Sequence, residues 1–221
     1  MPRTTPRRAI AAVAGAAALI VSTLVVGSQA VGAAPAAATC TKARFIVAKG
    51  TSEFGTLGFI VGDRINDQLT SKAPGVFTSE AVNYPGTTDA DSPVKGDVAV
   101  VAAVTAAIAA CPNQKIVISG YSQGAQIVDE AFGIDMTGTI NGGPPTAVLP
   151  ASARSHVAAV VLFGNPLGSI GKKVTGPYAS VTKEWCASGD PVCNPNQINI
   201  LAHLSYFLNA SDAATYILAK I

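Results

Sequence analysis

The chain has 221 residues, of which 49% are hydrophobic and 13% charged, which is enough to bury one sizeable core. Three of its 15 basic residues lie within the first eight positions, so the rest of the chain carries 12 basic and 13 acidic residues, a net charge of −1. This balance gives no electrostatic reason to expect a nucleic-acid partner or binding to an anionic surface.

The first 38 residues have the layout of a secretory signal peptide followed by a small-residue spacer. Arginines at the start precede the uncharged run Ala9–Val26, and small-residue cleavage sites follow at Ala30 and Ala38. Cleavage is expected between Ala30 and Thr39, which leaves residues 39–221 as a single domain. The sequence therefore predicts a secreted, extracellular protein.

Three alternatives for this segment stay open. The apolar run is long for a signal core, so an uncleaved membrane anchor is the main rival. Arg7 and Arg8 resemble a twin-arginine export signal, although the residues after them fit that pattern poorly. A lipoprotein site at Cys40 is less favoured, because Thr39 stands where a smaller residue is expected.

Four cysteines in an exported chain indicate two disulfides. Pairing Cys186 with Cys193 closes a short loop and leaves Cys40 to pair with Cys111. There is no Cys-x-x-Cys, and the two histidines lack metal-ligand spacing, so neither a metal nor a cofactor is predicted.

Apolar strands alternate with segments of helical periodicity along the chain. We expect an α/β three-layer sandwich with a central, mostly parallel five-stranded sheet and helices on both faces. Asp91 is expected to cap the second helix with Pro93 in its first turn, and Asn209 or Ser211 to cap the last helix. The irregular stretch Gly133–Pro150 is expected to lie over the rim of the sheet. The predicted strands are Ala43–Ala48, Val76–Tyr84, a third around Ile116–Ile118, His156–Phe163 and Ser180–Trp185.

Ser122 is the candidate nucleophile. It lies between a β-branched strand and a helical segment, inside the Gly-x-Ser-x-Gly pattern made by Gly120 and Gly124. A serine attacks only when it is held clear of the backbone, beside a base and near donors for the oxyanion. The pattern alone arises by chance, but a strand-to-helix turn is the context in which it forms a nucleophile elbow.

Strand polarity selects His203 as the candidate base. In parallel sheets the functional groups collect beyond the carboxyl ends of the strands. His156 opens the fourth strand and so belongs to the opposite edge, whereas His203 follows the fifth strand in a segment that can fold back over the active edge.

The acid is selected by elimination among the carboxylates between the nucleophile and the base. Asp129 and Glu130 lie on the helix that leaves the serine, Asp135 follows that helix, and Glu184 lies within a strand. Asp190 remains, inside a loop that a disulfide would hold rigid. The order Ser, Asp, His is that of the α/β hydrolases.

The chain resembles the cutinase family of serine esterases, and in particular the cutinase-like proteins of mycobacteria and other actinobacteria. The resemblance covers Cys40 to Ile221. It is carried by several motifs in the same order: Lys49–Glu53 (KGTSE), Val82–Pro85 (VNYP), Gly120–Gly124 (GYSQG), Cys186–Cys193 (CASGDPVC) and His203–Tyr206 (HLSY).

This resemblance implies a triad of Ser122 as nucleophile, His203 as general base and Asp190 as its partner. It also implies an oxyanion hole made by the amides of Thr51 and Gln123, and the same two disulfides. Fungal members usually have Arg and Ser where this chain has Lys49 and Thr51, which leaves the hole intact but makes the substrate range less certain.

The resemblance further implies an α/β-hydrolase fold without a large lid and activity on esters of short- to medium-chain acids. The acyl chain is expected to contact Ile198, Ile200 and Leu201, together with Leu167 and Ile170. Beyond a small-molecule or lipid ester, peripheral contact with lipid or the cell envelope stays open, and a monomer is expected.

Two other functions stay open. The same triad would serve an acyltransferase or thioesterase that acts on cell-envelope lipids. Alternatively, the scaffold would serve as a non-catalytic antigen that binds lipid or the cell wall. The presence of all three expected triad residues argues against the second alternative.

Overall fold

The structure is a computed structural model that describes residues 40–221. The predicted leader and its cleavage site lie outside the described residues. The strands are β1 (Ala43–Ala48), β2 (Phe77–Ala81), β3 (Lys115–Tyr121), β4 (Val157–Phe163) and β5 (Thr182–Trp185). The helices are α1 (Gly62–Lys72), α2 (Asp91–Ala110), α3 (Gln123–Ala131), α4 (Ile200–His203) and α5 (Ala210–Leu218). Short 3-10 helices are η1 (Ala151–Ser155), η2 (Pro166–Ile170), η3 (Gly176–Val181) and η4 (Tyr206–Asn209).

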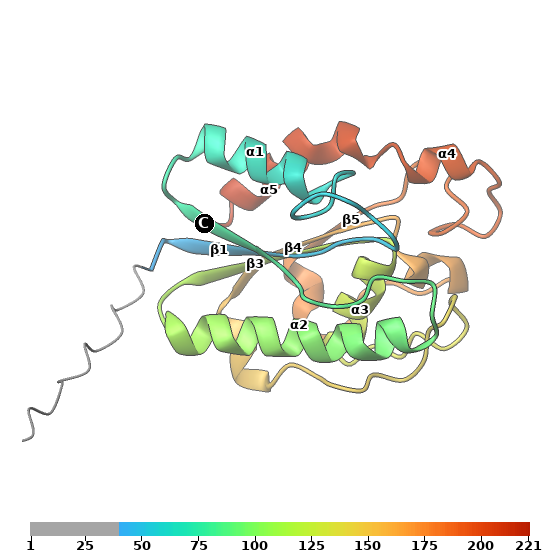
Figure 1. The fold of residues 1–221 in the computed structure, drawn as a ribbon, viewed down its shortest axis with the longest axis horizontal. Coiled ribbons are helices and arrows are strands. Elements are labelled where there is room, and N and C mark those ends of the chain that lie inside the picture. The colour runs from blue at the N-terminus through green and yellow to red at the C-terminus, as the bar shows by residue number, and fades with distance from the viewer. Residues whose placement is uncertain (1–39) are drawn as a thin grey trace, which may run out of the picture. The chain divides into compact units, whose positions relative to one another are not determined.

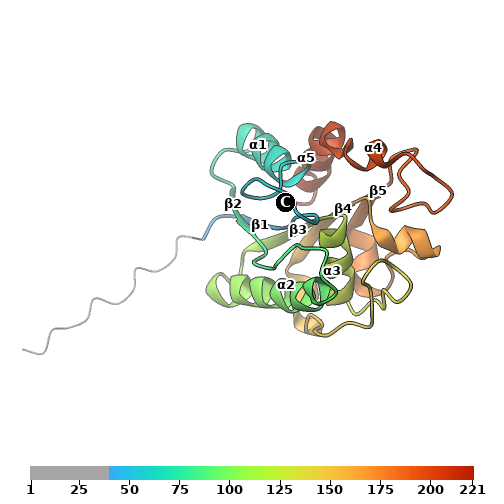
Figure 2. The same cartoon turned by 45° about the vertical axis from the view of Figure 1, so that its right-hand side comes forward.

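The five strands form one sheet in the order β2-β1-β3-β4-β5, and every neighbouring pair is parallel. Helices α1 and α5 cover one face, and α2 and α3 cover the other (Figures 1 and 2). The predicted three-layer α/β fold is therefore confirmed. Because all strands run the same way, their carboxyl ends share one edge, and α4 lies at that edge (Figure 1).

The strands build two apolar layers because their side chains alternate between the faces. In β1, Phe45 and Val47 pack beneath α1 and α5, whereas Ile46 packs towards α2 and α3. Both layers are fully buried around the central strands. This packing holds β3 and β4 rigidly, so the turns that leave them have fixed positions.

Helix α2 has the length and composition of a membrane span, but it packs in this fold through buried residues that include Val100 and Val104. Its start differs from the sequence expectation, because Ala90 is the N-cap and Asp91 already lies inside the helix without a capping bond. The hydroxyl of Ser92 instead accepts a hydrogen bond from the Thr87 amide (3.1 Å).

The structure contains both predicted disulfides, Cys40–Cys111 and Cys186–Cys193. The first joins the segment before β1 to the residue that ends α2, on the amino side of the sheet. The second closes a loop directly after β5, on the carboxyl side where the candidate catalytic residues lie.

Candidate active site

Ser122 occupies a sharp turn between β3 and α3, with φ 54° and ψ −122°. Two glycines make this turn possible. A Cβ at Gly120 would lie 2.6 Å from the carbonyl oxygen of Gly124, and a Cβ at Gly124 would lie 2.0 Å from that of Ala48. A non-glycine residue with positive φ costs on the order of 1–3 kcal/mol. The surrounding packing holds the strained serine out from the backbone, as expected for a nucleophile elbow.

Asp190 and His203 form a buried pair. Nδ1 of His203 lies 2.8 Å from Oδ2 of Asp190, whose side chain is fully buried. The Val192 amide donates to the other carboxylate oxygen (2.8 Å), within the loop closed by the second disulfide. Burial acts to raise the pKa of Asp190, but hydrogen bonds from His203, Tyr206 and Val192 outweigh it and lower that pKa. An ionised Asp190 keeps the proton on Nδ1 and leaves Nε2 free to accept one.

The imidazole of His203 is packed against the residues that flank the serine turn. The Tyr121 ring stacks on it with 5.0 Å between ring centroids, and the Tyr121 hydroxyl donates to the His203 carbonyl oxygen (2.8 Å). A Cβ at Gly164 would lie 2.6 Å from Cε1 of His203, so this position after β4 admits only glycine. Within residues 40–221, Ser122 Oγ forms no hydrogen bond with His203; such contacts often tighten only when substrate binds.

The predicted oxyanion donors Thr51 and Gln123 line the same cavity as Ser122. Gln123 is the first residue of α3, so its amide has no acceptor within the helix. In the turn after β1, the amides of Ser52 and Glu53 donate to loop carbonyls, whereas none of the described backbone carbonyls accepts from the Thr51 amide. Both Thr51 and Gln123 line one cavity with Ser122. The two predicted oxyanion donors are thus brought together with the predicted nucleophile.

The side chain of Gln123 fixes the start of α3 to the first turn of α2 and to the loop before it. Its Oε1 accepts from the Ser92 hydroxyl (2.8 Å), and its Nε2 donates to the Thr87 carbonyl oxygen (2.9 Å). Both polar atoms of the side chain are therefore engaged by these two residues.

Glu53 fixes the loop that carries Thr51, a role that sequence reasoning missed. Its carboxylate accepts from the amides of Gly50 (2.7 Å) and Ile60 (2.6 Å). Burial raises the pKa of Glu53 despite these two hydrogen bonds. The available signal was its place at the end of the Lys49–Glu53 motif, which contains a carboxylate in an otherwise uncharged turn after the lysine.

Ser122 opens onto a cavity of about 420 Å³, a volume that suits a small ligand. Ile140, Val192 and Ile200 supply apolar side chains to its lining. Ile140 belongs to the irregular stretch after α3, and its contribution to the rim agrees with the position expected for that stretch. Sequence reasoning missed Ile140 and Val192 as lining residues because neither lies in a segment with hydrophobic periodicity.

Of the predicted acyl-chain contacts, Ile200 lines this cavity and Leu167 does not, because Leu167 is fully buried in the core. Ile198 and Leu201 are 96% and 71% exposed and also lie outside the lining. The reason is helical geometry: in α4, Ile200 and His203 are three residues apart and share a face, whereas Leu201 is turned outward. Ile170 packs against the core.

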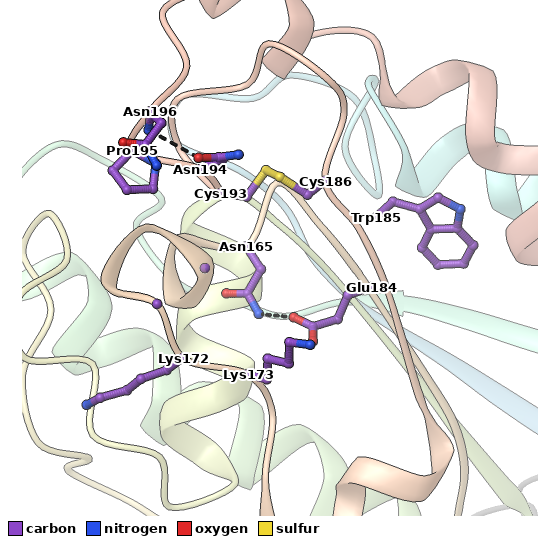
Figure 3. A pocket seen from close by; sticks show the side chains of 12 residues that line it. Asn165, Lys172, Lys173, Glu184, Trp185, Cys186, Cys193, Asn194, Pro195 and Asn196 are labelled. Atoms are coloured by element: carbon purple, nitrogen blue, oxygen red, sulfur yellow. Dashed lines mark hydrogen bonds between the residues drawn. A yellow bond between two sulfur atoms is a disulfide. The ribbon is translucent and has the colours of Figure 1, made fainter.

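A second cavity of about 630 Å³ is lined by residues that include Asn165, Glu184 and the Cys186–Cys193 disulfide (Figure 3). The neighbouring residues Pro166 and Val192 line the first cavity. Asn165 donates through Nδ2 to Glu184 (2.7 Å) and to Asp129 (2.9 Å). Asp129 is fully buried, which raises its pKa well above the usual range. Asp129 and Glu184 thus bond Asn165, whereas Asp190 bonds His203. The two sets of hydrogen bonds share no residue.

No group of three or more His, Cys, Asp or Glu side chains that could hold a metal ion occurs in residues 40–221. His156 follows η1 and precedes β4, at the amino edge of the sheet, as its position in the sequence predicts.

A family model described as Cutinase matches residues 39–221. The chain belongs to the cutinase family. It is 38% identical over 179 residues to a protein named cutinase from Kineococcus radiotolerans, covering 79% of this chain and 59% of that relative. It is 34% identical over 204 residues to the carboxylesterase Culp1 of Mycobacterium tuberculosis, covering 86% of this chain and 87% of the relative.

Among solved structures, the catalytic core domain of acetyl xylan esterase from Trichoderma reesei superposes with a TM-score of 0.72 at 28% identity, covering 82% of this chain and 100% of that chain. The resemblance to actinobacterial members of the cutinase family is confirmed. The predicted enzyme class, a carboxylic ester hydrolase, is confirmed with it.

Proposed function

We propose that this cutinase-family chain is a secreted serine esterase that hydrolyses esters of short- to medium-chain acids through an acyl-enzyme on Ser122. The observation that carries the proposal is the 2.8 Å contact between His203 Nδ1 and the buried Asp190 carboxylate, packed against the strained turn that presents Ser122. Two disulfides fit an extracellular location.

In the first step, Nε2 of His203 takes the proton of the Ser122 hydroxyl as Oγ attacks the ester carbonyl carbon. The carbonyl oxygen becomes an oxyanion, which the amides of Thr51 and Gln123 stabilise; one such donor contributes about 3 kcal/mol in comparable sites. The intermediate collapses, and the alcohol leaves with the proton held by His203.

In the second step, water gives a proton to His203 and attacks the acyl-enzyme carbonyl. The acid leaves and the proton returns to Ser122 Oγ. Asp190 stays ionised throughout and stabilises the imidazolium that forms in each step. The apolar side chains of Ile140 and Ile200 at the cavity suit an acyl chain.

Replacing Ser122 tests this proposal. Ser122→Ala is expected to lower turnover of p-nitrophenyl esters at least 10³-fold while leaving the unfolding transition close to that of the unsubstituted chain. The control is Ser155→Ala, which removes a hydroxyl that donates to the Ser152 carbonyl oxygen within η1. This 3-10 helix precedes β4 and so lies at the amino edge of the sheet, opposite the site. Retained turnover by Ser122→Ala refutes the nucleophile assignment.

An acyl-chain series of the same esters, run on both variants, identifies the preferred substrate. A maximum at short to medium chain length is expected from the limited cavity.

Competition between water and added alcohol acceptors separates hydrolysis from acyl transfer. Failure of Ser122 to react with a phosphonate probe would favour the non-catalytic alternative, binding of lipid or cell wall.

Exposed apolar side chains within five residues of His203 in the sequence support contact with lipid or the cell envelope. Ile198, Leu201 and Leu208 are 96%, 71% and 72% exposed. Sedimentation of the chain with phospholipid vesicles tests this contact, and sedimentation velocity without lipid tests the expected monomer.

A further inference from the structure

Tyr206 donates a hydrogen bond to the carboxylate oxygen that faces the candidate base. Its hydroxyl lies 2.5 Å from Oδ2 of Asp190, the same atom that lies 2.8 Å from Nδ1 of His203. The Ala187 amide donates to the Tyr206 hydroxyl oxygen (3.0 Å). Because that amide occupies the acceptor side of the hydroxyl, the single phenolic proton is directed at Asp190.

The ring of Tyr206 cannot move away from this contact, because it is fully buried. It packs edge-on against the rings of His203, Tyr121 and Phe163, with centroids 6.1, 5.9 and 5.9 Å away. Burial and, to a smaller extent, the hydrogen bond to Asp190 raise the pKa of Tyr206. The phenol therefore stays neutral and remains a hydrogen-bond donor.

We propose that Tyr206 is a positioning residue for the triad, holding Oδ2 of Asp190 in place and setting how strongly this carboxylate attracts a proton on His203. The proposal rests on the proposed function, because it assigns a role in the same site. A carboxylate oxygen shared by two donors presents less negative charge to each of them. The phenol therefore keeps His203 neutral, and able to act as a base, at a lower pH than an unshared carboxylate would allow.

The other titratable groups around the imidazole come from two elements. Tyr121 of β3 stacks on the ring, and Glu53 of the loop after β1 acts electrostatically on Tyr121. Substitution of Tyr206 leaves the hydrogen bonds of Glu53 to the Gly50 and Ile60 amides in place, and burial raises the pKa of Tyr121 far above neutral pH. A shift in the activity profile would therefore report on Asp190 and His203.

The test is Tyr206→Phe, which keeps the buried ring and removes only the hydroxyl. The acid limb of the kcat/KM profile against pH is expected to move up by about 0.5–1 pH unit, since a hydrogen bond to a charged group is lost. Looser placement of the carboxylate is expected to lower kcat by about 10-fold, with KM changed much less. A residue that only packs would change stability and leave the acid limb in place.

The matched control is Tyr121→Phe, because its hydroxyl is also buried beside His203 but donates to a backbone carbonyl. Its acid limb is expected to stay where the unsubstituted chain has it. Replacing Tyr206 by ortho-fluorotyrosine, a more acidic phenol of nearly the same size, is expected to move the limb to lower pH. This variant gives a decisive result even if Tyr206→Phe fails to fold.

The role of Tyr206 is overturned if neither replacement of Tyr206 moves the acid limb, or if Tyr121→Phe moves it equally. Failure of the proposed function looks different. In that case, Ser122→Ala retains turnover or Ser122 in the unsubstituted chain does not react with a phosphonate, whatever Tyr206 does.

Discussion

At the scale of single residues, the turn that carries Thr51 is held in its conformation by hydrogen bonds from neighbouring residues. Ser52, next to Thr51, has φ 54°, the same sign that strains Ser122. The Ser52 amide donates to the Gly86 carbonyl oxygen (2.6 Å), and the carboxylate of Glu53 accepts two further amides. A backbone amide stabilises an oxyanion best when it is already oriented before negative charge develops on the substrate oxygen. Because Glu53 holds the turn that contains Thr51, the proposed oxyanion donor, we expect substitution of Glu53 to affect catalysis through the Thr51 amide.

Glu53→Gln is expected to lower kcat by about 10-fold, part of the effect of losing an oxyanion donor, with a smaller change in KM. Glutamine offers one acceptor oxygen where two amides need acceptors, so the amide of Gly50 or Ile60 loses its partner. The free energy of unfolding is expected to change less, because removing a buried charge, whose burial raises the pKa of Glu53, offsets part of the lost hydrogen bond.

Steady-state kinetics and urea unfolding check this expectation. Glu80→Gln serves as the control. Glu80 lies on the edge strand β2, and its carboxylate pairs with Arg44 (2.7 Å) and does not bond the Thr51 loop. Equal kinetic effects of the two substitutions would contradict a specific role for Glu53.

At the scale of elements, α3 carries the Gln123 amide at its start and two buried carboxyl groups further along. All nine of its residues are buried, including Asp129 and Glu130. Glu130 accepts from Gln126 within the helix (3.2 Å). Burial, reinforced by the nearby carboxylates of Asp97 and Asp135, raises the pKa of Glu130 to about 7.

This raised pKa predicts a stability that falls as pH rises. The folded state binds the proton of Glu130 more tightly than the unfolded state, so the contribution is complete below about pH 4.5 and is lost as pH rises through about 7. The loss is at most about 3 kcal/mol. Glu130→Gln, which stays neutral, should match the unsubstituted chain near pH 4.5 and be more stable at pH 8.

Guanidinium unfolding at both pH values measures the difference. Asp212→Asn is the control of opposite sign, because hydrogen bonds from Lys183 and Trp185 lower the pKa of Asp212, whose contribution is therefore present at neutral pH and lost in acid. An unchanged difference between Glu130→Gln and the unsubstituted chain at the two pH values would contradict the buried-carboxyl explanation.

The elements that could be predicted are those whose periodicity reflects burial. Strand β4 is a continuous apolar run and β1 is interrupted only by Arg44, and both are predicted nearly to their ends, because a strand buried on both faces has few polar positions. The single-turn helix α4 could not be predicted from four residues, and its rotation decides that Ile200, not Leu201, lines the cavity. The contacts of Glu53 and Tyr206 were also beyond sequence reasoning, since they depend on how separate loops meet.

At the scale of the whole molecule, the two disulfides act at opposite edges of the sheet. Cys40–Cys111 spans 71 residues and ties the start of the domain to the end of α2. Cys186–Cys193 spans seven residues around Asp190. Chain-entropy estimates give a stabilisation of about 4.4 kcal/mol for the long loop and about 2.5 kcal/mol for the short one. The larger contribution to stability is thus expected far from the site.

The two disulfides should therefore separate stability from activity. The double variant Cys40→Ser and Cys111→Ser is expected to lose more unfolding free energy but to keep kcat/KM at temperatures where it stays folded. The double variant Cys186→Ser and Cys193→Ser is expected to lose less stability but at least about 10-fold in kcat/KM, because small displacements of a catalytic group are costly and Asp190 depends on this loop for the Val192 amide. Guanidinium unfolding and ester kinetics on both variants check the contrast, with each variant serving as the control for the other. Full activity in the second variant would show that the hydrogen bonds to Asp190, rather than the disulfide, hold the carboxylate against His203.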